Sequence, residues 1–127
     1  MVKLDEGLAF GGNITAVSAL TEEYDGSAWT GGGNLNTARK YLAGAGTQTL
    51  GLAFGGNTGG ITGVTEEYNG TSWTNSTSLT TARSGLGGTG TQTAGLAFGG
   101  GTTVVVANTE EYTSAIVTTT PSTLTTS

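Results

Sequence analysis

The residues of this chain best suited to chemistry are three pairs of neighbouring glutamates. Each pair lies in a Thr-Glu-Glu-Tyr motif, and successive motifs are 44 residues apart: Glu22/Glu23, Glu66/Glu67 and Glu110/Glu111. Paired carboxylates can ligate Ca²⁺ or act as acid and base in glycoside hydrolysis. Adjacent residues of a β-strand point to opposite faces, however, so the two acids of a pair do not converge. We therefore favour a structural role for them.

Composition excludes most other chemistry. The chain has no histidine and no cysteine, which rules out a Ser-His-Asp triad, a histidine zinc site and a thiolate metal centre. We predict that the protein is not an enzyme, binds no metal and needs no cofactor. Its net charge is −5 and its four basic residues do not cluster, so nucleic acid is not an expected partner. No apolar run is long enough to cross a bilayer, so we expect no membrane association.

Two arginines recur with the same period as the acids. Arg39 and Arg83 each end a Thr-Ala-Arg motif. We predict that one glutamate per copy forms a partly buried ion pair with this arginine. There are three acid pairs and two such arginines, so Glu22 or Glu110 should lack a partner within the chain, whereas Glu66 should have one.

Most aromatic residues also follow this period. Eight of the nine do so: Phe10, Phe54, Phe98, Tyr24, Tyr68, Tyr112, Trp29 and Trp73. An aromatic side chain buries roughly 150–250 Å², and recurrence at equivalent positions favours packing between neighbouring sheets. The alternative for the two tryptophans is a platform on which a sugar or base stacks. Tyr41 is the exception to the period and is a second candidate platform.

The whole chain is built from one repeated unit. Gly-Leu-Ala-Phe-Gly-Gly occurs at 7–12, 51–56 and 95–100, and residues 7–50 agree with 51–94 at 24 of 44 positions. A fixed period of this length indicates a repeat architecture. We expect a single repeat domain over residues 1–127, with copies at 7–50 and 51–94 and a partial copy at 95–127.

Each copy is rich in threonine and glycine, which favours short strands and turns. In the middle copy we predict four strands at 41–47, 50–55, 61–68 and 71–79. Asp25-Gly26 and Asn69-Gly70 favour tight hairpins with positive φ at both central residues. The first copy lacks most of its innermost strand, so the expected total is eleven strands, close to three four-stranded units.

Four landmarks of the middle unit resemble the kelch repeat. These are a Gly-Gly pair closing a strand, a tyrosine, a tryptophan and an arginine, here Gly55-Gly56, Tyr68, Trp73 and Arg83. The resemblance implies an all-β propeller whose blades pack radially. The Thr- and Gly-rich units also resemble kelch-like repeats in structural, tail-associated proteins of marine bacteriophages. That resemblance implies a structural protein located in the virion.

Three blades cannot close a propeller ring, and an open fan exposes its end faces. Two copies supply six blades, a common size. We therefore expect a head-to-tail homodimer, in which the tail 121–127 is a candidate to complete the partner's first blade. The alternatives are that the chain is a fragment of a longer propeller, or that other virion proteins cover its ends.

Recognition is expected where the copies differ. The variable loops carry small polar residues, and the candidates are Asn13, Thr15, Asn34, Asn57, Thr58, Asn75 and Thr102. Loops on a rigid scaffold often bind ligands, although drift in unconstrained loops gives the same pattern. The expected function is a non-enzymatic phage structural module, and the alternative is a lectin-like propeller that binds carbohydrate.

Overall fold

The computed structural model describes residues 6–114 of the chain. These residues form ten β-strands and no helix. The strands are β1 (Gly7–Phe10), β2 (Thr21–Tyr24), β3 (Trp29–Gly31), β4 (Ala43–Gly46), β5 (Gly51–Phe54), β6 (Thr65–Tyr68), β7 (Trp73–Ser76), β8 (Gly87–Gly90), β9 (Ala94–Phe98) and β10 (Thr109–Thr113).

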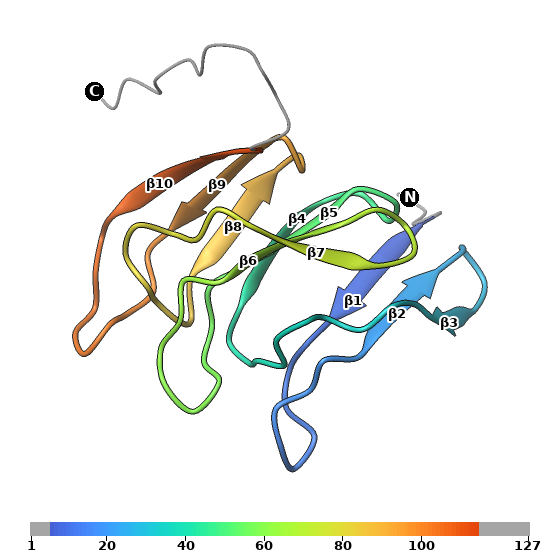
Figure 1. Ribbon diagram of the computed structural model, residues 1–127, viewed down its shortest axis with the longest axis horizontal. Coiled ribbons are helices and arrows are strands. Elements are labelled where there is room, and N and C mark those ends of the chain that lie inside the picture. The colour runs from blue at the N-terminus through green and yellow to red at the C-terminus, as the bar shows by residue number, and fades with distance from the viewer. Residues whose placement is uncertain (1–5, 115–127) are drawn as a thin grey trace.

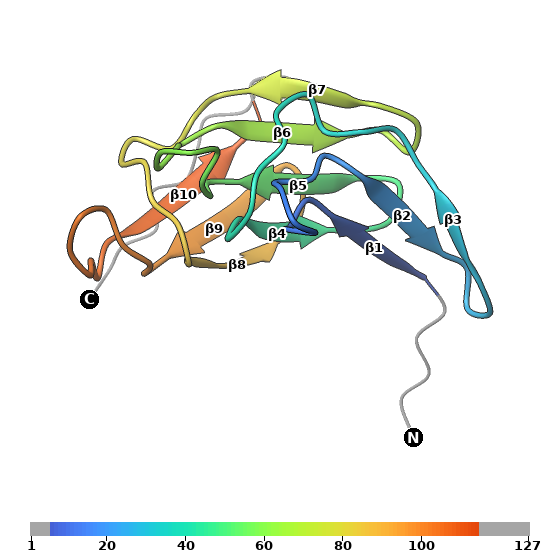
Figure 2. The ribbon, with the colours of Figure 1, turned by 90° about the horizontal axis from the view of Figure 1, so that it is seen from below.

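The strands form three antiparallel sheets in which neighbours in sequence are neighbours in space. We call β1–β3 blade 1, β4–β7 blade 2 and β8–β10 blade 3. Blade 2 lies between the other two, and the sheets follow one another in chain order (Figures 1 and 2). The prediction of an all-β fold made of propeller-like blades is confirmed.

Strand pairing reproduces the 44-residue period. Leu52 lies opposite Glu67 in blade 2, and the equivalent pairs are Leu8 with Glu23 in blade 1 and Leu96 with Glu111 in blade 3. Residues 44 apart therefore occupy equivalent positions, so one blade can be compared with another residue by residue.

The strands are shorter than the sequence pattern predicts. The predicted strand 61–68 is observed as β6 (Thr65–Tyr68), and 71–79 as β7 (Trp73–Ser76). Gly55 and Gly56 adopt φ of +71° and +110°, which turns the backbone out of the sheet. Residues 57–61 then close a small loop of their own through the bridge between Asn57 and Ile61. Residues 61–64 are thereby taken out of the blade.

The predicted hairpins are present, but their predicted turn type is wrong. The connection after β6 is a four-residue loop, 69–72, and Asn69 does not have positive φ. Its side-chain Oδ1 accepts hydrogen bonds from the backbone N–H groups of Thr71 and Ser72, at 2.9 and 2.8 Å. The loop 25–28 is built the same way around Asp25. The side chain satisfies the amides of the loop, so a two-residue turn is not required.

Ten of the eleven predicted strands fall within residues 6–114. Blade 1 has three strands there and blade 2 has four, as expected. The predicted fourth strand of the third copy and the tail 121–127 lie outside the described residues.

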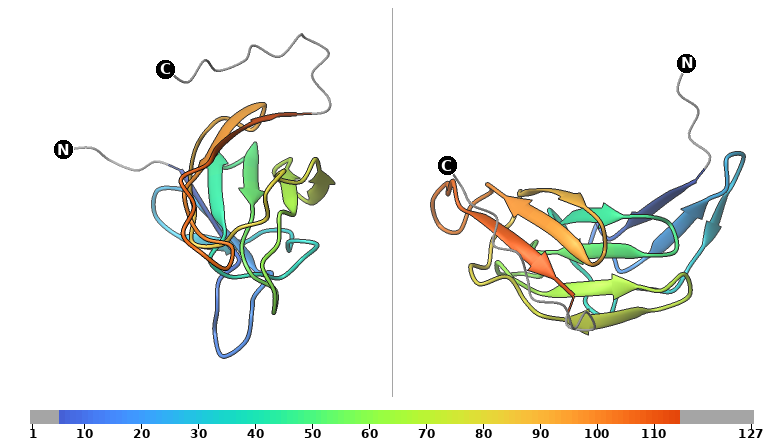
Figure 3. Two further views of the ribbon diagram at one scale, coloured as in Figure 1. Left: turned by 90° about the vertical axis from the view of Figure 1, so that its left-hand side faces the viewer. Right: turned by 90° about the horizontal axis from the view of Figure 1, so that it is seen from above.

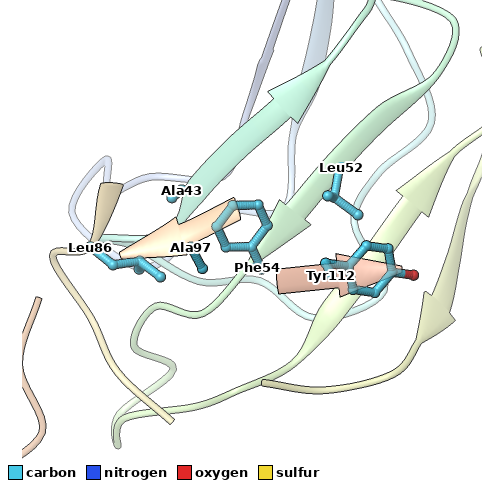
Figure 4. Close-up of a cluster of buried hydrophobic side chains, with 6 residues drawn as sticks. All are labelled: Ala43, Leu52, Phe54, Leu86, Ala97 and Tyr112. Carbon is cyan, nitrogen blue, oxygen red and sulfur yellow. The ribbon is translucent and has the colours of Figure 1, made fainter. Parts of the chain in front are cut away.

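The core consists of two equivalent clusters, one at each junction between blades. We call the side of a blade that faces the next blade its forward face, and the opposite side its rear face. At the first junction Leu8 and Phe10 meet Ala53, Tyr68 and Trp73 of the rear face of blade 2. At the second, Leu52 and Phe54 meet Ala97 and Tyr112, with Leu86 beside them (Figure 4).

The innermost strands must be glycine-rich for the blades to approach. A Cβ atom built on Gly44 of β4 would lie 2.5 Å from Cζ of Phe10, and one on Gly88 of β8 would overlap the ring of Phe54. Each phenylalanine thus places the tip of its ring against the backbone of the next blade, a contact that any side chain there would disrupt.

Candidate functional site

The most polar feature of the interior is the ion pair between Arg39 and Glu66. Arg39 Nη1 lies 2.6 Å from Glu66 Oε2, and both side chains are 0% exposed. The same carboxylate accepts hydrogen bonds from the backbone N–H groups of Asn36 and Thr37, at 2.7 and 3.2 Å. Arg39 Nε donates to the Gly55 carbonyl at 2.8 Å. The pair therefore fastens the segment that leaves blade 1 to the rear face of blade 2.

The second junction repeats this arrangement. Arg83 Nη2 lies 2.8 Å from Glu110 Oε2, and Glu110 accepts the backbone N–H groups of Thr80 and Thr81 at 2.6 and 3.0 Å. Arg83 Nη1 also donates to the carbonyl of Asn108. Among the buried side-chain atoms of residues 6–114, Arg83 Nε alone has no hydrogen-bond partner. The predicted pairing of one glutamate per copy with an arginine is present at both junctions.

Glu22 is the equivalent of Glu66 and Glu110 in the first copy. Its side chain is exposed, and no ion pair joins it to another residue of the described segment. Of the two glutamates that the prediction left open, Glu110 is paired with Arg83, and Glu22 is the one without an ion pair among residues 6–114.

In the first two copies, the second glutamate of the pair faces the following blade. The Tyr68 hydroxyl donates to the Glu23 carboxylate, and the Tyr112 hydroxyl donates to that of Glu67. Burial, reinforced by the carboxylate, raises the pKa of Tyr112 to about 12 and also raises the pKa of Tyr68. The phenols therefore remain protonated donors at neutral pH. The two acids of each pair act separately, on opposite faces of the blade.

Two glutamines also link the blades, and the sequence analysis did not assign them a role. Gln48 Nε2 donates to the carbonyls of Gly7 and Tyr24 in blade 1, at 3.3 and 2.5 Å. Gln92 Nε2 donates in the same way to Gly51 and Tyr68 in blade 2, at 3.0 and 2.6 Å. The recurrence of Thr-Gln-Thr at 47–49 and 91–93 is the sequence pattern that indicates a shared role for the two glutamines.

Equivalent tryptophans lie in different surroundings. Trp73 is 4% exposed, its Nε1 donates to Thr21 Oγ1 at 2.9 Å, and its ring centroid lies 4.9 Å from that of Phe10. Trp29, on the rear face of blade 1, is 49% exposed and contacts Tyr24 with ring centroids 5.0 Å apart. Packing between sheets therefore accounts for Trp73, whereas Trp29 remains accessible.

Most candidate recognition residues lie at one end of the blades. The long loops 11–20, 55–64 and 99–108 project from the same end, at the lower side of Figure 1. The exposed candidates are Asn13, Thr15, Asn34 and Thr58, and the half-buried ones are Asn57 and Thr102. Asn75 is not in a loop: it lies in β7, where its Oδ1 accepts a hydrogen bond from Asn36 Nδ2 at 3.4 Å. It is part of the junction between blades 1 and 2.

Tyr41 differs from its counterpart in the next copy. Its φ is +57°, and the equivalent residue is Gly85 with φ +69°. A tyrosine pays an energetic cost in this left-handed region, where glycine does not. The side chain is 61% exposed, and Lys40 Nζ lies 5.2 Å from the ring centroid. Tyr41 and Lys40 thus present an aromatic ring and a cation together at the start of β4.

A groove of about 500 Å³ lies along β1. It is lined by Leu8, Ala9 and Phe10 and by residues 42–47 on and around β4. In blade 2 the inner edge of β5 is occupied by β4, whereas β1 has no such neighbour among residues 6–114. Within the same segment no three acidic residues gather in a way that could hold a metal, and no helix could span a membrane.

Comparisons with known proteins indicate the fold of this chain but no family. No protein-family model matches the sequence, and no curated protein matches it. The structure resembles that of YjhT. The TM-score is 0.73 at 13% sequence identity, and the match covers 88% of this chain. The chain spans 41% of the length of the YjhT chain. Together with the three antiparallel sheets, this likeness identifies a propeller-like fold (Figure 3).

Proposed function

We propose that this protein is a non-enzymatic, kelch-like propeller module that serves as a structural, tail-associated component of a bacteriophage virion. One observation carries the structural role: at both internal junctions, the recurring side chains that could do chemistry are bonded between blades. Glu66 forms an ion pair with Arg39, and Glu67 accepts a hydrogen bond from the Tyr112 hydroxyl. The Trp73 indole N–H donates a hydrogen bond to the Thr21 hydroxyl. Groups held this way serve to fix the positions of the blades.

The kelch-like landmarks have matching structural roles. The Gly55-Gly56 pair turns the chain at the end of β5, and Tyr68 and Trp73 pack on blade 1. Arg83 lies in the segment that leaves blade 2, and its ion pair with Glu110 fastens that segment to blade 3. The virion assignment is supported by the resemblance of these Thr- and Gly-rich units to repeats in phage structural proteins.

Mass spectrometry of purified particles tests the virion assignment. Phage particles are purified from a culture that carries the gene, and peptides of this chain are quantified against the major capsid protein. We expect a fixed ratio after repeated density-gradient purification, and binding of an antibody against the chain at the tail. Loss of the peptides during purification would contradict the proposal.

A second candidate function is carbohydrate binding, favoured by the exposed, strained Tyr41 beside Lys40. An aromatic face next to a cation suits a sugar that carries an acidic group. A glycan array tests this with the wild-type chain and Tyr41→Gly. Glycine adopts the required φ without strain, so this change removes the ring and keeps the backbone. Saturable binding lost in Tyr41→Gly, but kept in a Leu50→Ser control at an exposed turn, would establish the lectin.

A further inference from the structure

We propose that the rear face of blade 1 binds the forward face of blade 3 of a second copy of this chain, so that two copies close head to tail. This inference extends the proposed structural role by naming the partner. It rests on the two junctions inside the chain, which provide a template for a third.

The two internal junctions use the same contacts. At the first, Leu8 lies against Gly51, where an added Cβ would be 2.6 Å from Leu8 Cδ2. At the second, Leu52 lies against Gly95 at the same separation. The forward-facing phenylalanines of blades 1 and 2, Phe10 and Phe54, likewise pack on the glycine backbone of the next blade. One forward face therefore fits one rear face, and this fit recurs every 44 residues.

Blade 3 presents a forward face of the same kind. Phe98 is 42% exposed, whereas its equivalent Phe54, which is covered by blade 3, is 2% exposed. Leu96 occupies the position of Leu52. Thr109 is exposed, whereas its equivalent Thr21 is buried and accepts the indole N–H of Trp73. These residues are therefore exposed for contact with the rear face of another blade.

Blade 1 presents the matching rear face. Ala9 is exposed, whereas its equivalents Ala53 and Ala97 are buried in the two junctions. Trp29 is 49% exposed, against 4% for Trp73. Glu22 and Tyr24 complete the face. Exposed apolar side chains such as Ala9 and Trp29, side by side with polar ones at the edge, are typical of an interaction site.

The repeat assigns the contacts across the new junction. Phe98 of one copy meets Trp29 of the other, as Phe10 meets Trp73. The Trp29 indole donates to Thr109 Oγ1, as Trp73 donates to Thr21. Leu96 lies on Gly7, as Leu8 lies on Gly51. A tryptophan and a phenylalanine at the centre are typical of residues that dominate binding energy.

A junction between two different faces either closes into a ring or continues as a filament. Two copies supply six blades, within the usual range of four to eight. This number of blades favours a closed pair of chains.

Light scattering during size-exclusion chromatography of the full chain, over a concentration series, tests this. We expect a mass of twice 12.6 kDa at high concentration. Phe98→Asp and Ala9→Asp should each reduce it to one chain, because a carboxylate would be buried in the junction. Ile14→Asp is the matched control, because Ile14 is apolar and exposed. Its equivalent Thr58 is exposed in blade 2, which has neighbours on both sides, so this position lies outside the junctions.

Mixing the two Asp variants distinguishes head-to-tail binding from other modes. Each variant keeps one intact face, so we expect one-to-one pairs in the mixture although neither variant pairs by itself. Thr109→Asp replaces Phe98→Asp if the latter loses its strand signal in circular dichroism. A single-chain mass for the wild type at every concentration would overturn the proposal, as would growth beyond two chains or an unchanged mass in Phe98→Asp. A monomer that is nevertheless found in virions would overturn this inference and leave the proposed function standing.

Discussion

The Arg39–Glu66 pair is fully buried, so its removal should be far more costly than that of a surface pair. Glu66→Gln leaves the Arg39 charge buried without its counter-ion, and we expect the free energy of unfolding to fall by about 3–5 kcal/mol. Urea denaturation of the purified variant measures this change.

The repeat provides the matched control for that change. Glu22→Gln alters the equivalent residue of the first copy, which is exposed in the single chain but lies on the face proposed to pair. Both substitutions are therefore compared in the Phe98→Asp background, which removes that pairing. We expect a change within about 0.5 kcal/mol. If Glu66→Gln and Glu22→Gln lower the free energy of unfolding equally, the buried ion pair is not the cause of the loss.

Tyr112 links stability to high pH. Its pKa in the folded protein is raised to about 12, mainly by burial, above the ordinary value of 10.0. The unfolded chain therefore releases this proton at lower pH than the folded chain. The stabilisation is complete below pH 10 and is lost as the pH rises towards 12.

We therefore expect the free energy of unfolding to decrease between pH 10 and 12, and to decrease less in Tyr112→Phe. Denaturation curves at several pH values measure both slopes. Tyr41→Phe is the control, because Tyr41 is exposed and has no carboxylate partner among the described residues. If the free energy of unfolding falls with pH equally in the wild type and in Tyr112→Phe, Tyr112 is not the cause of this pH dependence.

At this scale the sequence predicted the ion pairs, because acids and arginines recurred in fixed register. It did not predict the roles of Gln48 and Gln92. Their acceptors are backbone carbonyls of another blade, and backbone acceptors leave no pattern in the sequence. For Asn75 the sequence led to two conflicting predictions, the strand 71–79 and a variable loop, and the structure supports the strand.

At the scale of strands, the close approach of blades depends on glycine in β4 and β8. Gly88→Ala would place a Cβ atom 2.3 Å from Cζ of Phe54, and we expect the free energy of unfolding to fall by about 1–3 kcal/mol. Gly60→Ala is the control, because a Cβ there has nothing within 4 Å and φ is not positive. Thermal unfolding followed by circular dichroism compares the two. A larger loss in Gly60→Ala would contradict the packing described.

Strand number and order could be predicted from the repeat, whereas strand length could not. The predicted strand 61–68 included residues 61–64, but the bridge between Asn57 and Ile61 removes them from the sheet. The loops 25–28 and 69–72 were misassigned for a related reason. Asp25 and Asn69 accept amide protons within their own loops, which competes with the tight turn that the Asp-Gly and Asn-Gly pairs favour.

For the whole molecule, the 44-residue period implied sheets stacked side by side, because a blade of this size cannot bury its apolar face alone. The structure adds which residues of each face are covered. The covered positions of blade 2 include Ala53, Phe54 and Trp73, and their equivalents on the outer faces of blades 1 and 3 are exposed. The central claim is that these outer faces form the same junction between two chains.

The fluorescence of Trp29 tests this claim most directly. The chain has two tryptophans, so Trp73→Phe leaves Trp29 as the sole indole. As protein concentration rises, we expect Trp29 emission to shift to shorter wavelength and acrylamide to quench it less, and we expect neither change when Phe98→Asp is added. Trp29 emission and quenching that stay unchanged over the whole concentration range would contradict it.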